Sequence, residues 1–154
     1  MPTFNIKIAN KALKINAFNE STQRYCVAFL TDEEPDYTIT ITEEDLKNER
    51  TNSSDGKVYV NEEISALYRK IADLLVEKGI VVFHSSSFCV DNYAFLVTAR
   101  SGVGKSTHAR LLKEYLGDRF QYINDDKPLL EVKEDNVEVF STPWNGKEPA
   151  DGFR

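Results

Sequence analysis

The stretch Ala-Arg-Ser-Gly-Val-Gly-Lys-Ser-Thr, residues 99–107, organises the interpretation of this chain. The apolar residues 94–97 precede it and predict a buried strand, and the pattern of residues 107–116 predicts a helix. A strand, a glycine-containing loop, a Lys-Ser pair and a helix in this order are typical of a P-loop, which binds phosphate groups. The sequence therefore predicts a nucleotide-binding site here.

The residue types in this loop suit the binding of an anion. Gly102 and Gly104 lack a Cβ, so the backbone there can take positive φ values and turn its N–H groups inward, next to the positive end of the helix. Lys105 can reach the terminal phosphates, and the Ser106 hydroxyl can ligate Mg²⁺. The expected nucleotide-binding residues are Ser101, Gly102, Val103, Gly104, Lys105, Ser106 and Thr107.

One position departs from the P-loop pattern. The pattern places a glycine six residues before the lysine, and this chain has Ala99 there. The small side chain is compatible with the turn, but a positive φ at Ala99 would be strained. The alternative interpretation is that Gly-Val-Gly-Lys-Ser-Thr occurs by chance in a surface turn.

Length and composition set broad limits. A chain of 154 residues predicts one domain, with room for a small subdomain, and the net charge of −6 disfavours a dedicated nucleic-acid binder. Cys26 and Cys89 lie in apolar, strand-like runs and are expected to be buried reduced thiols, with a disulfide as the alternative. No run is apolar enough to span a membrane and no signal peptide opens the chain, so we expect no membrane partner and a cytoplasmic localisation. A homo-oligomer is left open.

Residues 1–60 predict a β-rich part with an antiparallel sheet, because apolar and polar residues alternate, as at Phe4, Ile6 and Ile8. The fuller apolar run at residues 25–30 predicts a central strand, and the polar residues 43–55 predict an exposed loop, with a short helical turn left open. The clearest helix is expected to begin at the N-cap Asn61, to bury a stripe that includes Leu67 and Leu75, and to end before Gly79.

The second half predicts short strands around the loop, at residues 80–84, 87–91, 94–98 and 120–124, with a turn at residues 92–93 and a hairpin from 129 to 140. The strand at 120–124 ends on Asp125 and Asp126. One of these carboxylates could hold Mg²⁺, and the other could accept the proton of an attacking hydroxyl. The alternative is an acidic turn before Pro128. Lys147, in the polar loop after the hairpin, is a further candidate for a phosphate or substrate contact, and the alternative is a surface lysine.

Together, His84, the loop at residues 101–106 and the Asp125-Asp126 pair resemble the HPr kinase/phosphorylase family, with its phosphoenolpyruvate carboxykinase-like nucleotide fold, over residues 80–148. The resemblance implies that Lys105 and the glycine backbone bind the phosphates of ATP, and that Ser106 ligates Mg²⁺. It also implies that Asp125 and Asp126 share the base and metal roles, and that His84 lies near the transferred phosphoryl or the acidic pair. Alternatively, His84 is a strand-end histidine with a hydrogen bond in the core.

The chain also departs from the family. Ala99 replaces a family glycine, and no counterpart of a further acidic metal-site residue or of the protein-substrate elements follows. Since the sequence stops at Arg154 without a closing element, we expect a fragment or a reduced member, and HPr itself is not supported as the substrate.

The expected fold class is mixed α/β, of the α+β kind: a β-rich part, residues 1–60, packed on a P-loop core with a mixed sheet, residues 61–154. The expected function is transfer of the terminal phosphoryl of ATP, with Mg²⁺, to a hydroxyl of a protein or small molecule. One alternative is a nucleotide-binding regulatory or interaction module without catalysis. Another is a relic of a nucleotide fold whose N-terminal β region binds a partner.

Overall fold

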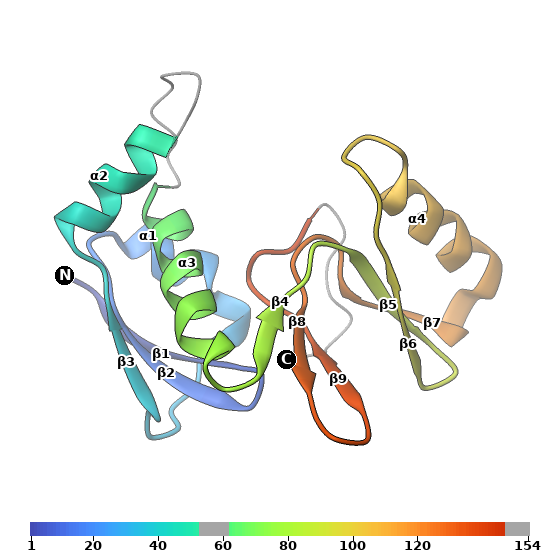
Figure 1. Ribbon diagram of the computed structural model, residues 1–154, viewed down its shortest axis with the longest axis horizontal. Helices are drawn as coiled ribbons and strands as arrows, with labels where there is room; N and C mark the ends of the chain where they lie inside the picture. Colours follow the sequence, from blue (N-terminus) through green and yellow to red (C-terminus); the bar gives the residue numbers. More distant parts are fainter. Residues whose placement is uncertain (53–61, 147–154) are drawn as a thin grey trace. The chain divides into compact units, whose positions relative to one another are not determined.

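The computed structural model describes residues 1–52 and 62–146, and the chain divides into two compact units, Met1–Lys78 and Gly79–Arg154 (Figure 1). The described part is a mixed α+β fold with three small sheets and four α-helices. The boundary between the units lies after Lys78 rather than at residue 60, so the helix expected to open the second part belongs to the first unit. None of the described helices is both long and apolar enough to cross a membrane.

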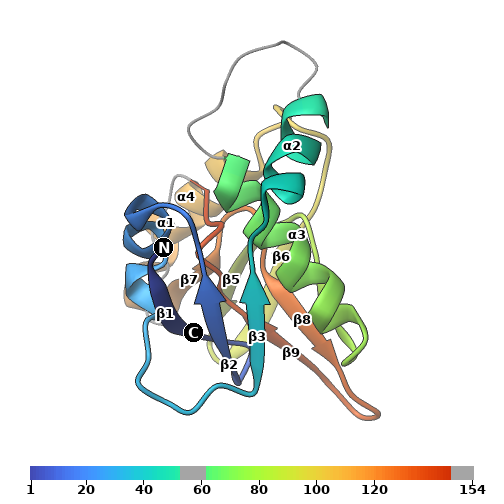
Figure 2. The same ribbon diagram turned by 90° about the vertical axis from the view of Figure 1, so that its left-hand side faces the viewer.

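The first unit contains a three-stranded sheet in which β2 (Lys11–Asn16) lies between β1 (Thr3–Ile8) and β3 (Tyr37–Thr40) (Figure 2). The alternating apolar residues of β1 are buried as expected. The expected antiparallel arrangement is right for β1 and β2 but wrong for β3, which pairs with β2 in parallel. The reason lies in the connection, since the chain passes through two short helices before it returns as β3.

The strand expected at residues 25–30 does not form. These residues belong to the end of α1 (Glu20–Tyr25) and the 3₁₀ turn Val27–Phe29. Thr22, Cys26 and Phe29 are buried while Tyr25 and Val27 are exposed, so burial follows helical spacing and not the alternation of a strand.

The loop expected at residues 43–55 is also wrong in its first part, which forms the helix α2 (Glu43–Asn52). Its start is a capping box: the Thr42 N–H donates to Asp45 Oδ2 at 2.7 Å, and the Asp45 N–H donates to Thr42 Oγ1 at 3.3 Å. Helix α3 (Glu62–Val76) follows and confirms the expected helix, burying Leu67, Ile71 and Leu75 among others. The proposed cap, Asn61, lies outside the described residues.

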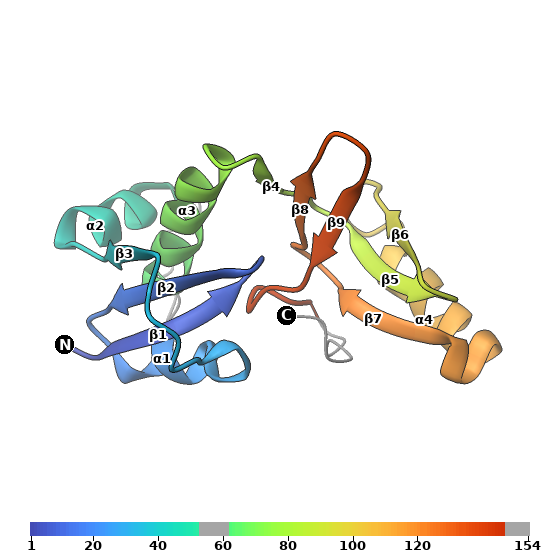
Figure 3. The same cartoon turned by 90° about the horizontal axis from the view of Figure 1, so that it is seen from below.

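The second unit has two antiparallel sheets (Figure 3). In one, β8 (Leu129–Val132) lies between β4 (Ile80–Val82) and β9 (Val137–Phe140), which confirms the expected hairpin. In the other, β5 (Ser86–Val90) lies between β6 (Tyr93–Val97) and β7 (Phe120–Asn124). Helix α4 (Lys105–Leu116) covers one face of this second sheet and, after the 3₁₀ turn Gly117–Arg119, leads into β7.

The core under α4 is aromatic. Phe88, Ala109, Phe120 and Tyr122 are buried together, and Phe88 stacks on Phe120 with the ring centroids 4.7 Å apart. The strand before the glycine loop was expected to be buried, but β6 is an edge strand, and Tyr93 is 74% and Phe95 48% exposed.

The described residues also include the turn between β5 and β6 and both cysteines. The turn that joins β5 and β6 is formed by Asp91 and Asn92, with φ values of 50° and 70°, one residue earlier than expected. Both cysteines are free thiols, as expected, and Cys26 is fully buried after α1 whereas Cys89 is only partly buried in β5. The alternative of a disulfide is therefore wrong.

Candidate functional site

The loop between β6 and α4, residues 98–104, is named the glycine loop here. Gly102 has a φ of 82° and Gly104 a φ of 101°, so both adopt the left-handed backbone expected from the sequence. Gly104 is the N-cap of α4, and its carbonyl accepts the His108 N–H at 2.8 Å. The loop thus ends at the N-terminus of a twelve-residue helix, where free N–H groups and the helix dipole favour an anion.

The strain anticipated at Ala99 does not arise. The non-glycine residues with positive φ in the described ranges are Ala9, Asn10, Asp91 and Asn92, so Ala99 keeps an ordinary backbone. Its carbonyl oxygen instead accepts a hydrogen bond from Lys105 Nζ at 3.0 Å. The loop reverses direction at Gly102 and Gly104, and therefore it does not require a glycine at position 99.

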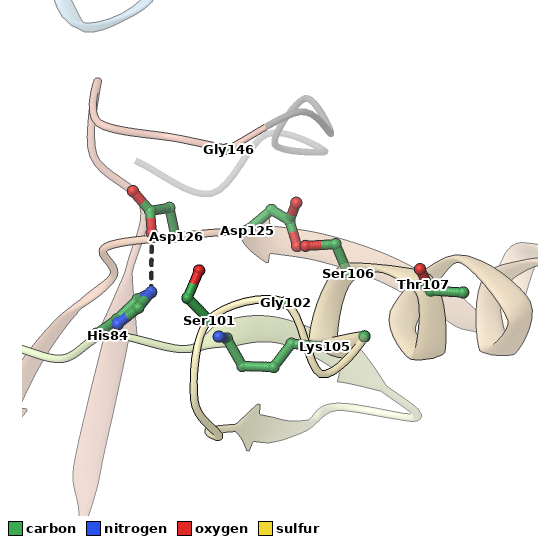
Figure 4. A pocket seen from close by; sticks show the side chains of 10 residues that line it. His84, Ser101, Gly102, Lys105, Ser106, Thr107, Asp125, Asp126 and Gly146 are labelled. Carbon is green, nitrogen blue, oxygen red and sulfur yellow. Dashed lines mark ion pairs between the residues drawn. The ribbon is translucent and has the colours of Figure 1, made fainter.

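A cavity of about 400 Å³ opens beside the glycine loop (Figure 4). Its size falls within the range of small-molecule sites. The loop and the first turn of α4 form one wall, and the end of β7 with His84 and Gly146 forms the other. The cavity brings together the sequence-predicted residues Ser101, Gly102, Gly104, Lys105, Ser106, Thr107, Asp125, Asp126 and His84, whereas Val103 is 63% exposed and does not line it.

Asp125 is the buried member of the acidic pair. It directly follows β7 and is 5% exposed, and its Oδ1 accepts a hydrogen bond from Ser86 Oγ at 2.7 Å. In Figure 4 the side chains of Asp125 and Ser106 point toward each other across the cavity. A carboxylate and a hydroxyl are both oxygen ligands, which is the donor type that Mg²⁺ prefers.

Asp126 has a different environment. Its Oδ1 lies 3.2 Å from His84 Nε2, and its Oδ2 forms an ion pair with Lys127. The Asp126 carboxylate is partly accessible, and the His84 ring is more exposed still. The two carboxylates that the sequence could not tell apart are therefore distinguished by their partners.

His84 was expected on a strand, but it lies in the connection between β4 and β5. Its carbonyl oxygen accepts Thr98 Oγ1 at 3.1 Å, and the following Ser85 N–H donates to the Asp126 carbonyl at 3.2 Å. The alternative of a core histidine is wrong, since the ring is 58% exposed and faces Asp126. Backbone hydrogen bonds fix His84 between the glycine loop and the acidic pair.

The sequence did not predict the contribution of residues 142–146, which follow β9. Gly146 lines the cavity, and the Asn145 side chain accepts the Asp125 N–H at 2.6 Å. The signals available were the turn-forming composition of this stretch and the family resemblance over residues 80–148, and neither indicates its partner. Lys147, the residue singled out there, lies outside the described residues.

The residues present fit a nucleotide with a divalent cation. Within residues 1–52 and 62–146, no group of three or more His, Cys, Asp or Glu side chains could hold a metal by itself. A Mg²⁺ ion would therefore combine Ser106 and Asp125 with phosphate oxygens and water, which is its usual mode of binding in phosphoryl-transfer sites. Lys105 and the N–H groups at the start of α4 would provide the positive charge for phosphates.

No known family model matches this chain, and no characterised protein sequence matches it.

Proposed function

We propose that this protein is an ATP-dependent phosphotransferase, which uses Mg²⁺ and transfers the terminal phosphoryl group of ATP to a hydroxyl of a protein or small molecule. The second unit would then be a P-loop core of the phosphoenolpyruvate carboxykinase-like type, as in the HPr kinase/phosphorylase family. One observation carries the proposal: Lys105 and Ser106 at the start of α4 line the same cavity as Asp125 and Asp126 at the end of β7.

The binding roles follow from charge and hydrogen-bonding capacity. The backbone N–H groups of the glycine loop and the Lys105 ammonium would bind the phosphates of ATP. Ser106 and Asp125 would hold Mg²⁺, since their oxygen atoms face each other across the cavity. When bound, Mg²⁺ neutralises charge on the phosphates.

Asp126 would be the general base. Its carboxylate would take the proton from the acceptor hydroxyl as the new O–P bond forms and the bond from the γ-phosphorus to the β,γ-bridging oxygen breaks, releasing ADP. His84 contacts the same carboxylate and is exposed to solvent, so it would orient Asp126 and pass the proton on to water. Lys127 would balance the charge of the paired carboxylates.

The test begins with calorimetric titration of ATP and Mg²⁺ into the full chain. Lys105→Met should abolish binding, whereas Lys133→Met should bind as the parent does, because Lys133 is an exposed lysine whose partners Glu131 and Glu138 lie in the β8–β9 hairpin. Asp126→Asn should bind ATP but lose ADP formation, measured with water as the acceptor. A parent chain that does not bind ATP, or equal ADP formation by Asp126→Asn, would contradict the proposal.

A second function, nucleotide binding without catalysis, is favoured by one observation. Both oxygens of Asp126 already have partners, His84 and Lys127, so an acceptor hydroxyl would have to compete with them for the carboxylate. This function predicts that ATP binds with dependence on Lys105 while no ADP forms. The same titration and ADP measurement separate the two functions.

A further inference from the structure

Gly146 lies directly against the Asp125 carboxylate. A Cβ at position 146 would be 2.8 Å from Asp125 Oδ2 and 3.0 Å from the Asp125 carbonyl oxygen. Real Cβ atoms essentially never approach other heavy atoms as closely as 2.8 Å, so a side chain here would displace Asp125 or the segment that carries residue 146. Residues 142–146 therefore approach the site as closely as they do only because position 146 lacks a side chain.

Two asparagine side chains connect this segment to the end of β7. Asn145 Oδ1 accepts the Asp125 N–H at 2.6 Å and the Gly146 N–H at 3.0 Å. Asn124, which is fully buried, donates through Nδ2 to the Thr142 carbonyl at 3.2 Å and to Thr142 Oγ1 at 3.1 Å. The segment is thus attached to β7 at both of its ends.

The same asparagines shape the acidic turn itself. Asn124 Oδ1 accepts the N–H groups of Asp126 at 2.9 Å and Lys127 at 2.7 Å. Thr142 Oγ1 closes the arrangement by donating to the Lys127 carbonyl at 2.8 Å. These hydrogen bonds fix the backbone of the turn, and so they keep the Asp125 and Asp126 carboxylates next to each other despite their mutual repulsion.

The two carboxylate oxygens of Asp125 have different neighbours. Oδ1 accepts the hydrogen bond of Ser86 Oγ, and Oδ2 lies beside Gly146. The space next to Oδ2 is the space that a Cβ at position 146 would fill. The carboxylate is therefore fixed at Oδ1 by Ser86 and bounded at Oδ2 by Gly146, which together set its orientation in the wall of the cavity.

We propose that Gly146 and Asn145 are positioning residues of the phosphotransfer site, which hold Asp125 in the orientation that lets it share a divalent cation with Ser106. This inference rests on the proposed function. It adds the segment after β9 as a third structural component of the site, beside the glycine loop and the acidic turn. Neither residue is assigned contact with the reacting atoms.

The experiment compares the affinity for ATP in Mg²⁺ with that in EDTA, by calorimetric titration into the full chain. The parent should bind more tightly with Mg²⁺. In Gly146→Ala the ratio of the two affinities should fall by about 10-fold to 100-fold, the effect typical of groups that position a metal ligand. Affinity in EDTA should stay unchanged, because Lys105 and the glycine loop are not altered.

Gly117→Ala is the matched control. It makes the same chemical change at the C-terminal end of α4, where no atom lies within 4 Å of the added Cβ. It should keep the parent's ratio of ATP affinity in Mg²⁺ to that in EDTA. If Gly146→Ala does not fold, Asn145→Ala takes its place, since it removes the acceptor of the Asp125 N–H without adding an atom.

The outcomes are distinct. Suppose that the parent binds ATP and Lys105→Met does not. If Gly146→Ala and Asn145→Ala then both keep the parent's ratio of ATP affinity in Mg²⁺ to that in EDTA, this inference is overturned and the proposed function is not. A parent that fails to bind ATP, or that binds it equally well after Lys105→Met, would overturn the proposed function and this inference together. A general loss of affinity in EDTA as well as in Mg²⁺ would also contradict the inference, because it would show a structural effect on the whole loop.

Discussion

Gly104 shows how much of the site depends on the backbone of single residues. Its φ of 101° ends the glycine loop and starts α4, and the first helical turn that follows lines the cavity. Residues with a side chain disfavour this region because the Cβ approaches backbone oxygen atoms. Ala99, by contrast, keeps an ordinary φ and contributes only its carbonyl oxygen.

Gly104→Ala should therefore lower the free energy of unfolding by about 1–2 kcal/mol. It should also weaken binding of Mg-ATP by about tenfold, the equivalent of about 1.4 kcal/mol, because the loop N–H groups shift. Urea denaturation and calorimetry measure the two effects. Gly117→Ala, with a φ of 58° at the other end of the helix, should reproduce the loss of stability alone. Unchanged nucleotide affinity in Gly104→Ala would contradict the prediction.

The two cysteines should differ strongly in reactivity. Burial raises the pKa of the Cys26 thiol from 9.0 to about 12, and the thiolate is the reactive form. At pH 8 iodoacetamide should modify Cys89 in the native protein and Cys26 only after unfolding, which mass spectrometry of peptides would show. Equal rates at both thiols would contradict this expectation.

The same shift in the pKa of Cys26 makes stability depend on pH. The unfolded thiol loses its proton near pH 9, while the native thiol keeps it up to about pH 12. The contribution of this group to the free energy of unfolding is therefore complete below pH 9 and decreases between pH 9 and 12. Cys26→Ala should reduce the slope of stability against pH in this range, as urea denaturation at several pH values would measure. An unchanged slope would show that other groups account for it.

At the scale of secondary structure elements, α3 is the main apolar support of the first unit. Its buried positions include Leu67, Ile71 and Leu75, at the spacing that places side chains on one face of a helix. Ion pairs join its polar side to α2, as between Arg69 and Glu49. Such surface ion pairs contribute little to stability, so packing of the apolar face dominates.

Leu75 and Val76 offer a direct test, since they are neighbours in the chain with opposite environments. Leu75 is fully buried and Val76 is 55% exposed. Leu75→Ala should lower the free energy of unfolding by about 2–5 kcal/mol, through lost burial and the cavity left behind. Val76→Ala should change it by less than about 0.5 kcal/mol. Circular dichroism during urea denaturation measures both, and similar values for the two variants would contradict the assignment of the buried face.

At the scale of the whole molecule, the chain contains two units with separate cores. The core of the first is formed by the sheet β1–β3 with α3, and one core of the second by the aromatic residues under α4. Among the described residues, all those that line the cavity beside the glycine loop belong to the second unit. A ligand in this cavity therefore makes its contacts with one unit.

Binding of Mg-ATP should accordingly protect the second unit from hydrogen exchange. At a ligand concentration of 100 times the dissociation constant, the folded second unit gains about 2.7 kcal/mol, and exchange through unfolding of this unit slows to match. Protection should appear in β5, β7 and α4 and be absent from β1, β2 and β3. Hydrogen exchange with mass spectrometry, with Lys105→Met as the control, measures this difference, and equal protection in both units would contradict it.

Local patterns in the sequence predicted those elements whose residues interact mainly with near neighbours along the chain. These are α3 with its apolar stripe, the β8–β9 hairpin, the strand Phe120–Asn124 and the left-handed glycines 102 and 104. Where burial depended on distant segments, the predictions were wrong. Residues 25–30 are apolar enough for a strand but bury a helical face, and β6 is apolar but lies at a sheet edge.

The sequence by itself determined the glycine loop, its Lys-Ser pair and the acidic residues that follow β7, because each is a short motif with a fixed local geometry. Only the tertiary structure decided how these pieces are arranged. It placed Asp125 opposite Ser106, paired Asp126 with His84, and brought Gly146 against the buried carboxylate. The physical reason is that these contacts join residues up to about 40 positions apart, and strand pairing and close packing, rather than local preference, bring such residues together.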